Sequence, residues 1–215
     1  MPYALPLLAL LAAYLLGSVS GGVILGRLRG VDIRDVGTGH AGGGNALRTQ
    51  GIPFALGVVA IDVAKGALAA WCGRRFGAPE GVFDVAGLGY GCAFMAMLGH
   101  AWPIWHRFRG GKGAAPLIGG LLVMWPWALP ALLLVWGGVL LATGYLGLAM
   151  AAMAIALPLL AWWNGASGSR WAFAVAAALF LLWAYRDNLI RMFAGGEARM
   201  ERARILHWLR RRGAR

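Results

Sequence analysis

The chain has 215 residues, of which 60% are hydrophobic and 13% are charged, and its formal net charge is +12. This composition excludes an ordinary soluble domain, and apolar runs of about 20 residues, long enough to cross a bilayer, recur along the chain. The basic residues are grouped in loops between these runs, a distribution that argues against a nucleic-acid-binding protein. We therefore expect an integral membrane protein.

The first apolar span runs from Leu5 to Gly26, and no Lys or Arg precedes it, so it lacks the basic start of a signal peptide. Segment 114–163 carries no Lys, Arg, Asp or Glu. It is too long for one crossing, because a helix rises about 1.5 Å per residue. We expect three helices there, with breaks near Trp125–Pro130 and Thr143–Gly147. The other expected spans are 53–72, 84–103 and 171–185.

The distribution of Lys and Arg sets the expected topology. Loop 27–52 contains four of them, loop 104–113 three and the tail from residue 186 nine, whereas loops 73–83 and 164–170 contain two and one. The positive-inside rule places the three richer segments in the cytoplasm. The predicted fold is therefore all-α, with seven transmembrane helices, the N-terminus outside and the C-terminus in the cytoplasm.

Residues 1–196 are predicted to form a single integral membrane domain, followed by a basic tail over 197–215. Two interpretations of this tail remain open: an amphipathic helix on the anionic inner leaflet, or a solvated positive tail. Its apolar side chains, interleaved with arginines, are Met200, Ile205, Leu206, Trp208 and Leu209. The two cysteines, Cys72 and Cys92, lie in apolar spans and are expected to be buried hydrophobes, with no disulfide or metal cluster.

The most informative motif is the glycine-rich stretch from Phe108 to Gly113, which lies between two apolar spans. Glycines let backbone N–H groups approach an anion, and Lys112 adds a point charge. We expect a phosphate-binding loop at the membrane–water boundary. A Walker A loop is excluded, because His106 and Gly113 stand where that motif needs Gly and Ser or Thr.

The first polar loop is also rich in glycine, and Thr38, His40, Asn45 and Arg48 supply hydrogen-bond donors within it. We interpret it as a binding loop, with a merely flexible loop as the alternative. The spacing Gly37-x-Gly39-x-x-Gly42 matches a dinucleotide fingerprint, but that motif needs a preceding strand and a βαβ unit. A membrane helix is expected there instead.

Three further polar groups stand out. Asp62 and Lys65 share a helix face within a span; they either neutralise each other or help to hold a cytoplasm-facing site. His100, at the end of a span, is either an interfacial hydrogen-bonding group or an acid–base catalyst. Asn188 and Arg191 lie three apart at the cytoplasmic end of the last span, as site residues or as ordinary flanking residues.

Together these clusters resemble the bacterial acyl-phosphate:glycerol-3-phosphate acyltransferases, the PlsY family, over about residues 10–197. The segments that carry the resemblance are Leu16-Gly17-Ser18, Gly26-Arg27-Leu28, Asp32-Ile33-Arg34, Gly37-Thr38-Gly39 with Asn45 and Arg48, Asp62-x-x-Lys65-Gly66, Gly99-His100-x-x-Pro103, Gly110-Gly111-Lys112-Gly113, and Asn188-x-x-Arg191 with Glu197. Seven helices with the N-terminus outside is also the family's architecture.

The resemblance implies an enzyme that transfers a fatty acyl group from acyl phosphate to glycerol 3-phosphate, giving lysophosphatidic acid and phosphate. It implies a bacterial plasma (inner) membrane location, an active site facing the cytoplasm, contact with membrane lipids, a monomer, and no metal, cofactor or nucleic acid. The catalytic residues would be His100, Lys112, Thr38 and Asn45. The substrate-binding residues would be Arg48, Gly110, Gly111, Gly113, Asn188, Arg191, Glu197 and His40.

The implied chemistry suits these residues. Acyl phosphate is already activated, so positioning and charge stabilisation can supply most of the acceleration without a covalent intermediate. The proton of the attacking hydroxyl would go to a phosphate oxygen or to His100. Another acyltransferase class uses His-x4-Asp, and none of the four histidines here has Asp five positions later.

The sequence departs from the family pattern at several positions. Thr38 replaces Ser, His40 replaces Asn, Gly44 replaces Thr, Arg109 replaces Lys, Tyr185 replaces His, and Thr143-Gly144-Tyr145-Leu146-Gly147 replaces Thr-Arg-Tyr-x-Ser. These changes leave a second hypothesis, a non-catalytic or substrate-altered paralogue that binds phosphorylated lipid precursors. A third is a transporter of a phosphorylated or lipid substrate, against which we find no internal repeat.

Overall fold

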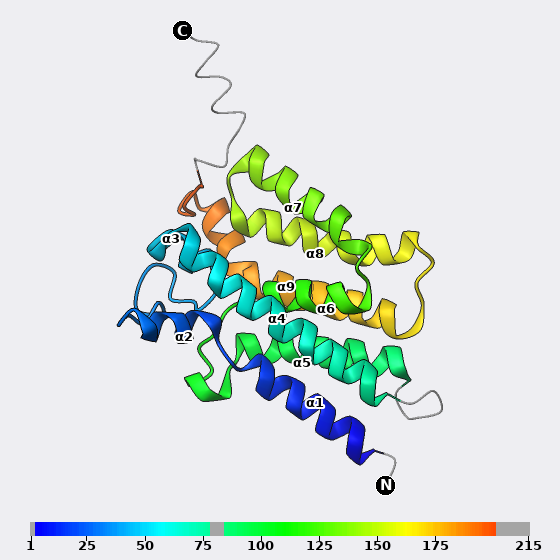
Figure 1. Ribbon diagram of the computed structural model, residues 1–215. Coiled ribbons are helices and arrows are strands. Elements are labelled where there is room, and N and C mark those ends of the chain that lie inside the picture. The colour runs from blue at the N-terminus through cyan, green and yellow to red at the C-terminus, as the bar shows by residue number, and fades with distance from the viewer. Residues whose placement is uncertain (1–2, 78–83, 201–215) are drawn as a thin grey trace. The chain divides into compact units, whose positions relative to one another are not determined.

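The computed structural model describes residues 3–77 and 84–200, and the regular structure in these residues is helical (Figure 1). The helices are α1 (Ala4–Gly17), α2 (Gly21–Leu28), α3 (Gly43–Gln50), α4 (Ile52–Phe76), α5 (Val85–Ala101), the 3₁₀ turn η1 (Ile104–His106), α6 (Ala114–Met124), α7 (Ala128–Thr143), α8 (Leu146–Trp163) and α9 (Gly168–Phe193). They form two compact units. Among the described residues, the N-terminal unit comprises 3–77, 84–126 and 168–173, and the C-terminal unit comprises 127–167 and 174–200.

Four described segments are long and apolar enough to cross a bilayer. They are Ala4–Leu28, which holds α1 and α2, and helices α4, α8 and α9; α6 and α7 are shorter apolar helices. The breaks predicted within the uncharged middle are confirmed, since α6 ends at Met124, α7 ends at Thr143 and α8 begins at Leu146. The all-helical membrane class therefore holds.

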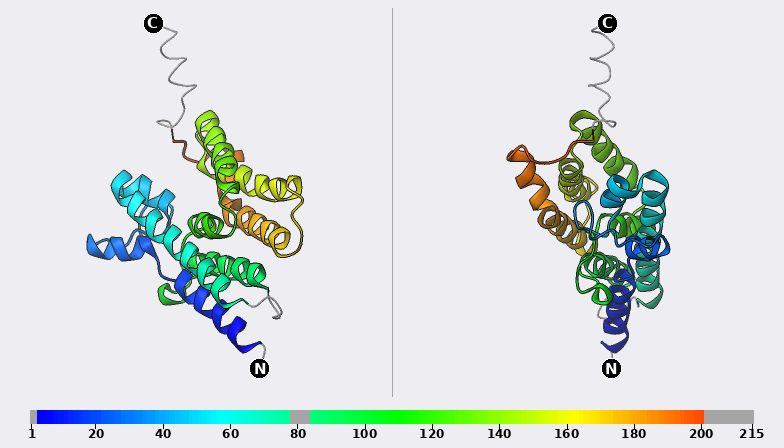
Figure 2. Two further views of the ribbon diagram at one scale, coloured as in Figure 1. Left: turned by 45° about the vertical axis from the view of Figure 1, so that its right-hand side comes forward. Right: turned by 90° about the vertical axis from the view of Figure 1, so that its left-hand side faces the viewer.

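In the N-terminal unit, α4 packs against α1, α2, α3, α5 and α6, as Figures 1 and 2 show. The contacts are made by small residues. A Cβ on Gly66 would lie 2.6 Å from the Cα of Pro116 in α6, and one on Gly17 would overlap the backbone of Ala96 in α5. Small residues let two helices approach closely. The resulting van der Waals packing stabilises helix contacts in a membrane, where no hydrophobic effect drives the helices together. The close packing at Gly17 and Gly66 is between helices of the same molecule.

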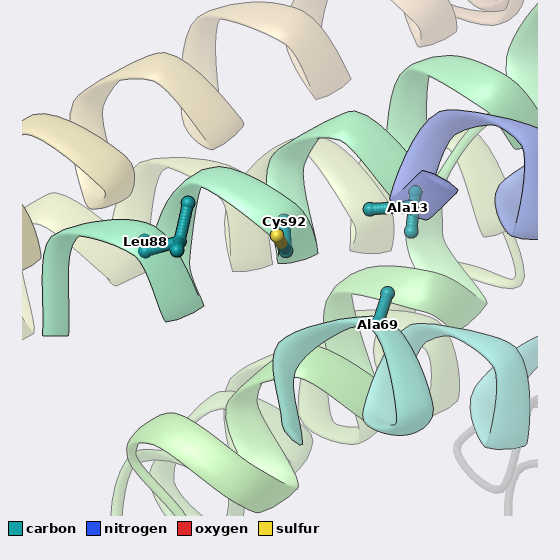
Figure 3. Close-up of a cluster of buried hydrophobic side chains, with 5 residues drawn as sticks. Ala13, Ala69, Leu88 and Cys92 are labelled. Carbon is teal, nitrogen blue, oxygen red and sulfur yellow. The ribbon is translucent and has the colours of Figure 1, made fainter. Parts of the chain in front are cut away.

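The core between α1, α4 and α5 follows the same rule. Figure 3 shows small side chains from three helices meeting with a single leucine. The cluster consists of Ala13, Ala69, Leu88, Cys92 and Ala96. The thiol of Cys92 is wholly buried here, as the sequence predicted for a small hydrophobe.

The predicted first span, Leu5 to Gly26, corresponds to the apolar segment Ala4–Leu28, and the structure shows that this segment is interrupted. The chain leaves the helix at Ser18 and restarts at Gly21, where the Ser20 hydroxyl accepts a hydrogen bond from the Val23 N–H at 3.3 Å. Serine at this position satisfies one of the donors that a helix start leaves unpaired. The break places polar backbone beside α4.

The first polar loop is not wholly irregular either, because it contains the helix α3. Ala46 of this helix joins a buried cluster with Ile33 of the loop and Phe54 and Val58 of α4. Burial on α4 stabilises a helix whose first two residues, both glycine, disfavour helix formation. The glycine-rich segment is therefore a fixed part of the N-terminal unit.

In the C-terminal unit, α7 and α8 pack against each other around the turn Gly144–Tyr145. Gly144 ends α7 with φ +76°, a left-handed conformation that favours glycine. Residues 197–200 fold back on this unit, where the Met200 N–H donates to the Gly144 carbonyl at 2.8 Å. The rest of the predicted basic tail, 201–215, lies outside the described residues.

Candidate active site

Asp62, Lys65 and His100 form a buried polar cluster in the N-terminal unit. The Lys65 Nζ lies 2.8 Å from Asp62 Oδ1 and 2.9 Å from His100 Nδ1, and all three residues are less than 5% exposed. His100 Nδ1 also lies 3.4 Å from Asp62 Oδ1, so the ring contacts both members of the ion pair. The carboxylate and the ammonium neutralise each other, as a buried charge requires.

The same ion pair supports the break between α1 and α2. The Gly21 N–H donates to Asp62 Oδ1 at 3.3 Å, and Lys65 Nζ donates to the Val19 carbonyl at 2.6 Å. Backbone groups released from a helix within a membrane need such partners. The pair is therefore mutually neutralised, and it also supports the backbone of the neighbouring helix break.

His100 joins this cluster to the glycine–lysine loop. The Gly111 N–H donates to the His100 carbonyl at 3.0 Å, and a Cβ on Gly111 would overlap Nε2 of the imidazole ring. The ring is thus enclosed by Lys65 and Asp62 on one side and by Gly111 on the other. His100 therefore connects the buried ion pair to the glycine–lysine loop.

The glycine–lysine loop leads directly into α6. Gly113 is the N-cap with φ +83°, and no side chain caps the helix start. Pro116 stands in the first turn and has no N–H, so fewer donors remain to be satisfied there. The amides at a helix N-terminus attract an anion, and half-buried Lys112 lies beside them.

Asn45 organises the first glycine-rich loop. Its Oδ1 accepts from the Thr38 N–H at 2.8 Å, while its Nδ2 lies 2.6 Å from the Ile33 carbonyl and 3.0 Å from that of His40. The side-chain amide of Asn45 is buried and bonded to loop backbone, so it fixes the conformation of this loop. Gly37 is required here, since a Cβ would overlap Asn45 Oδ1.

The other predicted residues of this loop lie at its surface or beside it. Thr38 is exposed, and a ring nitrogen of His40 lies 2.8 Å from the Thr38 carbonyl. Arg48 lies half-buried on α3. The loop meets the glycine–lysine loop directly, because the Ala41 N–H donates to the Gly110 carbonyl at 3.1 Å.

Arg34 makes a second connection between the two loops, one absent from the predicted site residues. Its Nε donates to Asp32 Oδ1 at 2.9 Å, and its Nη1 donates to the His106 carbonyl at 3.0 Å. The hydrogen bond from Arg34 lowers the pKa of Asp32 to about 2, so this carboxylate stays ionised. Burial lowers the pKa of His106, and nearby Arg34 and Arg27 lower it further. The sequence pointed to Arg34 through the segment Asp32-Ile33-Arg34, which is one of those that carry the family resemblance.

In the C-terminal unit, Glu197 joins two predicted residues of α9. Asn188 Nδ2 donates to Oε1 at 2.7 Å, and Arg191 Nε donates to Oε2 at 2.8 Å. Asn188 and Glu197 are buried, whereas Arg191 is exposed. Gly147 of α8 lies against this group, because a Cβ there would come 2.5 Å from Asn188 Cβ. The three residues therefore form one cluster.

Comparison with known proteins agrees with this geometry. A sequence profile of the glycerol-3-phosphate acyltransferase family matches residues 7–195. Glycerol-3-phosphate acyltransferases of Synechococcus sp. (strain CC9902) and Rhodopseudomonas palustris (strain BisB5) are 39% and 38% identical over 196 and 194 residues. These alignments cover 90% and 89% of this chain and 94% of each relative.

Two crystal structures of PlsY, an integral membrane glycerol 3-phosphate acyltransferase, have similar folds. The glycerol 3-phosphate form gives a TM-score of 0.83 at 29% identity and covers 91% of this chain and 95% of that one. The lysophosphatidic acid form gives 0.81 at 28% identity, over 90% and 94% of the two chains. The chain therefore belongs to the glycerol-3-phosphate acyltransferase family of integral membrane enzymes.

Proposed function

We propose that this chain transfers a fatty acyl group from acyl phosphate to glycerol 3-phosphate, giving lysophosphatidic acid and phosphate in the first step of phospholipid synthesis. The observation that carries the proposal is the glycine–lysine loop, which runs into the uncapped N-terminus of α6 and is held by His100. The relatives named above and the PlsY structures in glycerol 3-phosphate and lysophosphatidic acid forms support it.

In this reaction a hydroxyl oxygen of glycerol 3-phosphate attacks the acyl carbonyl carbon. The new C–O bond forms, the bond between that carbon and the phosphate oxygen breaks, and phosphate leaves with its electron pair. The hydroxyl proton passes to a phosphate oxygen, since His100 is enclosed. Lys112, the first amides of α6 and Arg48 stabilise the negative charge on phosphate and on the carbonyl oxygen.

The remaining predicted contacts have binding or supporting roles. Gly110, Gly111 and Gly113 shape the phosphate loop, Thr38 and His40 face the acceptor, and Asn45 and His100 fix the two loops. In the C-terminal unit, Asn188, Arg191 and Glu197 form a second polar cluster for substrate. The acyl chain lies among apolar helices beside membrane lipids.

We further propose a seven-span topology in the bacterial inner membrane, with the N-terminus outside, the C-terminus inside and a monomeric enzyme working at the cytoplasmic face. The numbers of Lys and Arg in the loops support this orientation. Cysteine-accessibility labelling from each side of intact vesicles tests it. Labelling of a cysteine placed at exposed Arg109 from outside intact cells would overturn the orientation.

Phosphate release by the purified protein in lipid tests the activity, with long-chain acyl phosphate and glycerol 3-phosphate as substrates. We expect release that requires the acceptor and falls about 100-fold or more in Lys112→Ala, the cost of losing one stabilising donor. Arg75→Ala, which removes an exposed cation at the end of α4, is the matched control and should leave the rate unchanged.

The non-catalytic paralogue is the other outcome of this experiment. Binding of acyl phosphate without phosphate release, in protein that is folded and membrane-embedded, would refute the enzyme and favour that alternative. Equal rates for the wild type and Lys112→Ala would instead overturn the role of the glycine–lysine loop. The first result would therefore concern the reaction, and the second would concern the location of the site.

A further inference from the structure

The C-terminal end of α9 is shaped to turn the chain back on itself. Gly195 has φ +75°, its N–H donates to the Met192 carbonyl at 3.1 Å, and the Gly196 N–H donates to the Arg191 carbonyl at 2.8 Å. This pair of bonds around a left-handed glycine is a Schellman motif, which ends a helix and fixes the direction of the following residues. The segment 196–200 therefore leaves α9 along a defined path.

Two further contacts hold this segment in place. The Glu197 carboxylate, 8% exposed, is bonded to both Asn188 and Arg191. Three residues later, the Met200 N–H donates to the Gly144 carbonyl at 2.8 Å. A non-helical segment is thus fixed at both ends, with one end on α9 and the other on the turn between α7 and α8.

Arg199 is the side chain that this segment brings to the turn. Its Nε donates to the Tyr145 hydroxyl at 2.7 Å, and its guanidinium carbon lies 4.8 Å from the centre of the Tyr145 ring. Within residues 3–77 and 84–200, its two terminal nitrogens make no hydrogen bond and its charge has no ion-pair partner. Within 196–200 the acidic residue is Glu197, which is already paired with Arg191.

We propose that Arg199 binds a phosphate group of a substrate at the α7–α8 turn. This assignment rests on the proposed acyltransferase function and adds to it a binding residue from outside the helices. The cation–π contact and the hydrogen bond from Nε hold the guanidinium at Tyr145, while the two terminal nitrogens remain as a fork of donors. A planar fork of this kind matches two phosphate oxygens.

The composition of the α7–α8 turn explains why a residue distant in sequence, Arg199, supplies a cation there. Position 144 is glycine and carries no side chain, so the turn itself offers no cation beside Tyr145. Arg199 lies on the next residue, Tyr145, and its neighbour Met200 is bonded to Gly144 itself. The segment therefore restores positive charge where the helical part of the chain lacks it.

Steady-state kinetics of purified variants in lipid test this assignment, with glycerol 3-phosphate and acyl phosphate varied separately. Arg199→Ala should raise KM for one phosphate substrate about tenfold, the ratio for losing one charge-assisted hydrogen bond. Arg199→Lys should show a smaller rise. Adding Gly144→Arg to Arg199→Ala should recover at least part of the loss, despite the left-handed backbone at that position.

The controls separate binding from stability and from the proposed function. Arg186→Ala removes another exposed guanidinium of the same unit, one stacked on Trp183, and should change neither KM. Unchanged KM values in Arg199→Ala would overturn the proposal. So would a loss of activity that matches a fall in thermal stability and that Gly144→Arg does not recover, because Arg199 would then be only a tether. Absence of turnover in the wild type would instead refute the acyltransferase function.

Discussion

Replacing Asp62 with alanine should destabilise the protein by about 3–5 kcal/mol, the usual cost of removing one partner from a buried ion pair. The carboxylate is 1% exposed and Lys65 is 4% exposed, so the ammonium left behind is not rehydrated. The Gly21 N–H loses its acceptor at the same time. The expected damage is therefore to the α1–α2 break and to the His100 ring that rests on Lys65.

A double variant separates the charge from the hydrogen bonds. In Asp62→Asn with Lys65→Gln, an amide oxygen still accepts from Gly21 and an amide nitrogen still donates to the Val19 carbonyl, but no charge is buried. We expect this variant to be more stable than Asp62→Ala by about 1–3 kcal/mol, because an unpaired buried charge costs more than an imperfect neutral pair.

Reversible unfolding in mixed micelles measures both effects. Asp84→Ala is the matched control, since this aspartate caps α5 by accepting from the Gly87 N–H at 2.6 Å, and its loss should cost only about 1 kcal/mol. If Asp62→Ala destabilises no more than Asp84→Ala, the cluster is not the buried ion pair inferred here. The same reasoning would be refuted if the stability losses of the single variants Asp62→Asn and Lys65→Gln simply added up in the double variant.

Two further predictions concern the loops. Gly111→Ala should lower turnover sharply and cost about 1–3 kcal/mol of stability, because the new Cβ overlaps the His100 ring; Gly138→Ala, where a Cβ meets nothing within 4 Å, is the control for both rate and melting temperature. Arg34→Ala should destabilise the protein at neutral pH. Because Arg34 lowers the pKa of Asp32 from 3.8 to about 2, this difference in melting temperature should be constant above pH 5 and shrink between pH 4 and 2. A difference that is unchanged at pH 2 would contradict the linkage.

Hydropathy located the apolar spans and the helix breaks of the uncharged middle, but it missed the break between α1 and α2. Leu5–Gly26 is apolar almost throughout, and two serines in such a run do not predict an interruption. The partners that make the break stable, Asp62 and Lys65, lie about forty residues further along the chain. A local pattern cannot show that backbone at one position will be bonded by charges at another.

The helix α3 was missed for a related reason. Its sequence begins with two glycines, which local propensity assigns to a loop. Burial of Ala46 against α4 overrides that preference. Asn45 lies on this helix, so its four contacts with the loop backbone also depend on a structure that the residue pattern did not predict.

For the site, the sequence predicted which residue types are present but not which of them meet. Spacing placed Asp62 and Lys65 on one face, and Asn188 and Arg191 on another, and both pairs interact with a common partner. The partner is His100 in the first case and Glu197 in the second. Spacing along a helix specifies neighbours within three or four residues only, so neither partner's contact followed from it.

The departures from the family pattern at Gly144 and Gly147 show that the effect of a substitution depends on the residues around it. Taken alone, the loss of an arginine and a hydroxyl counts against catalysis. In the structure, Gly147 is the residue that lets Asn188 approach α8, since even a Cβ there would come 2.5 Å from the Asn188 side chain. Gly144 accepts a hydrogen bond from the segment that carries Arg199 to Tyr145. Both glycines therefore take part in specific contacts within the same unit, so the missing side chains do not by themselves argue that the site has been lost.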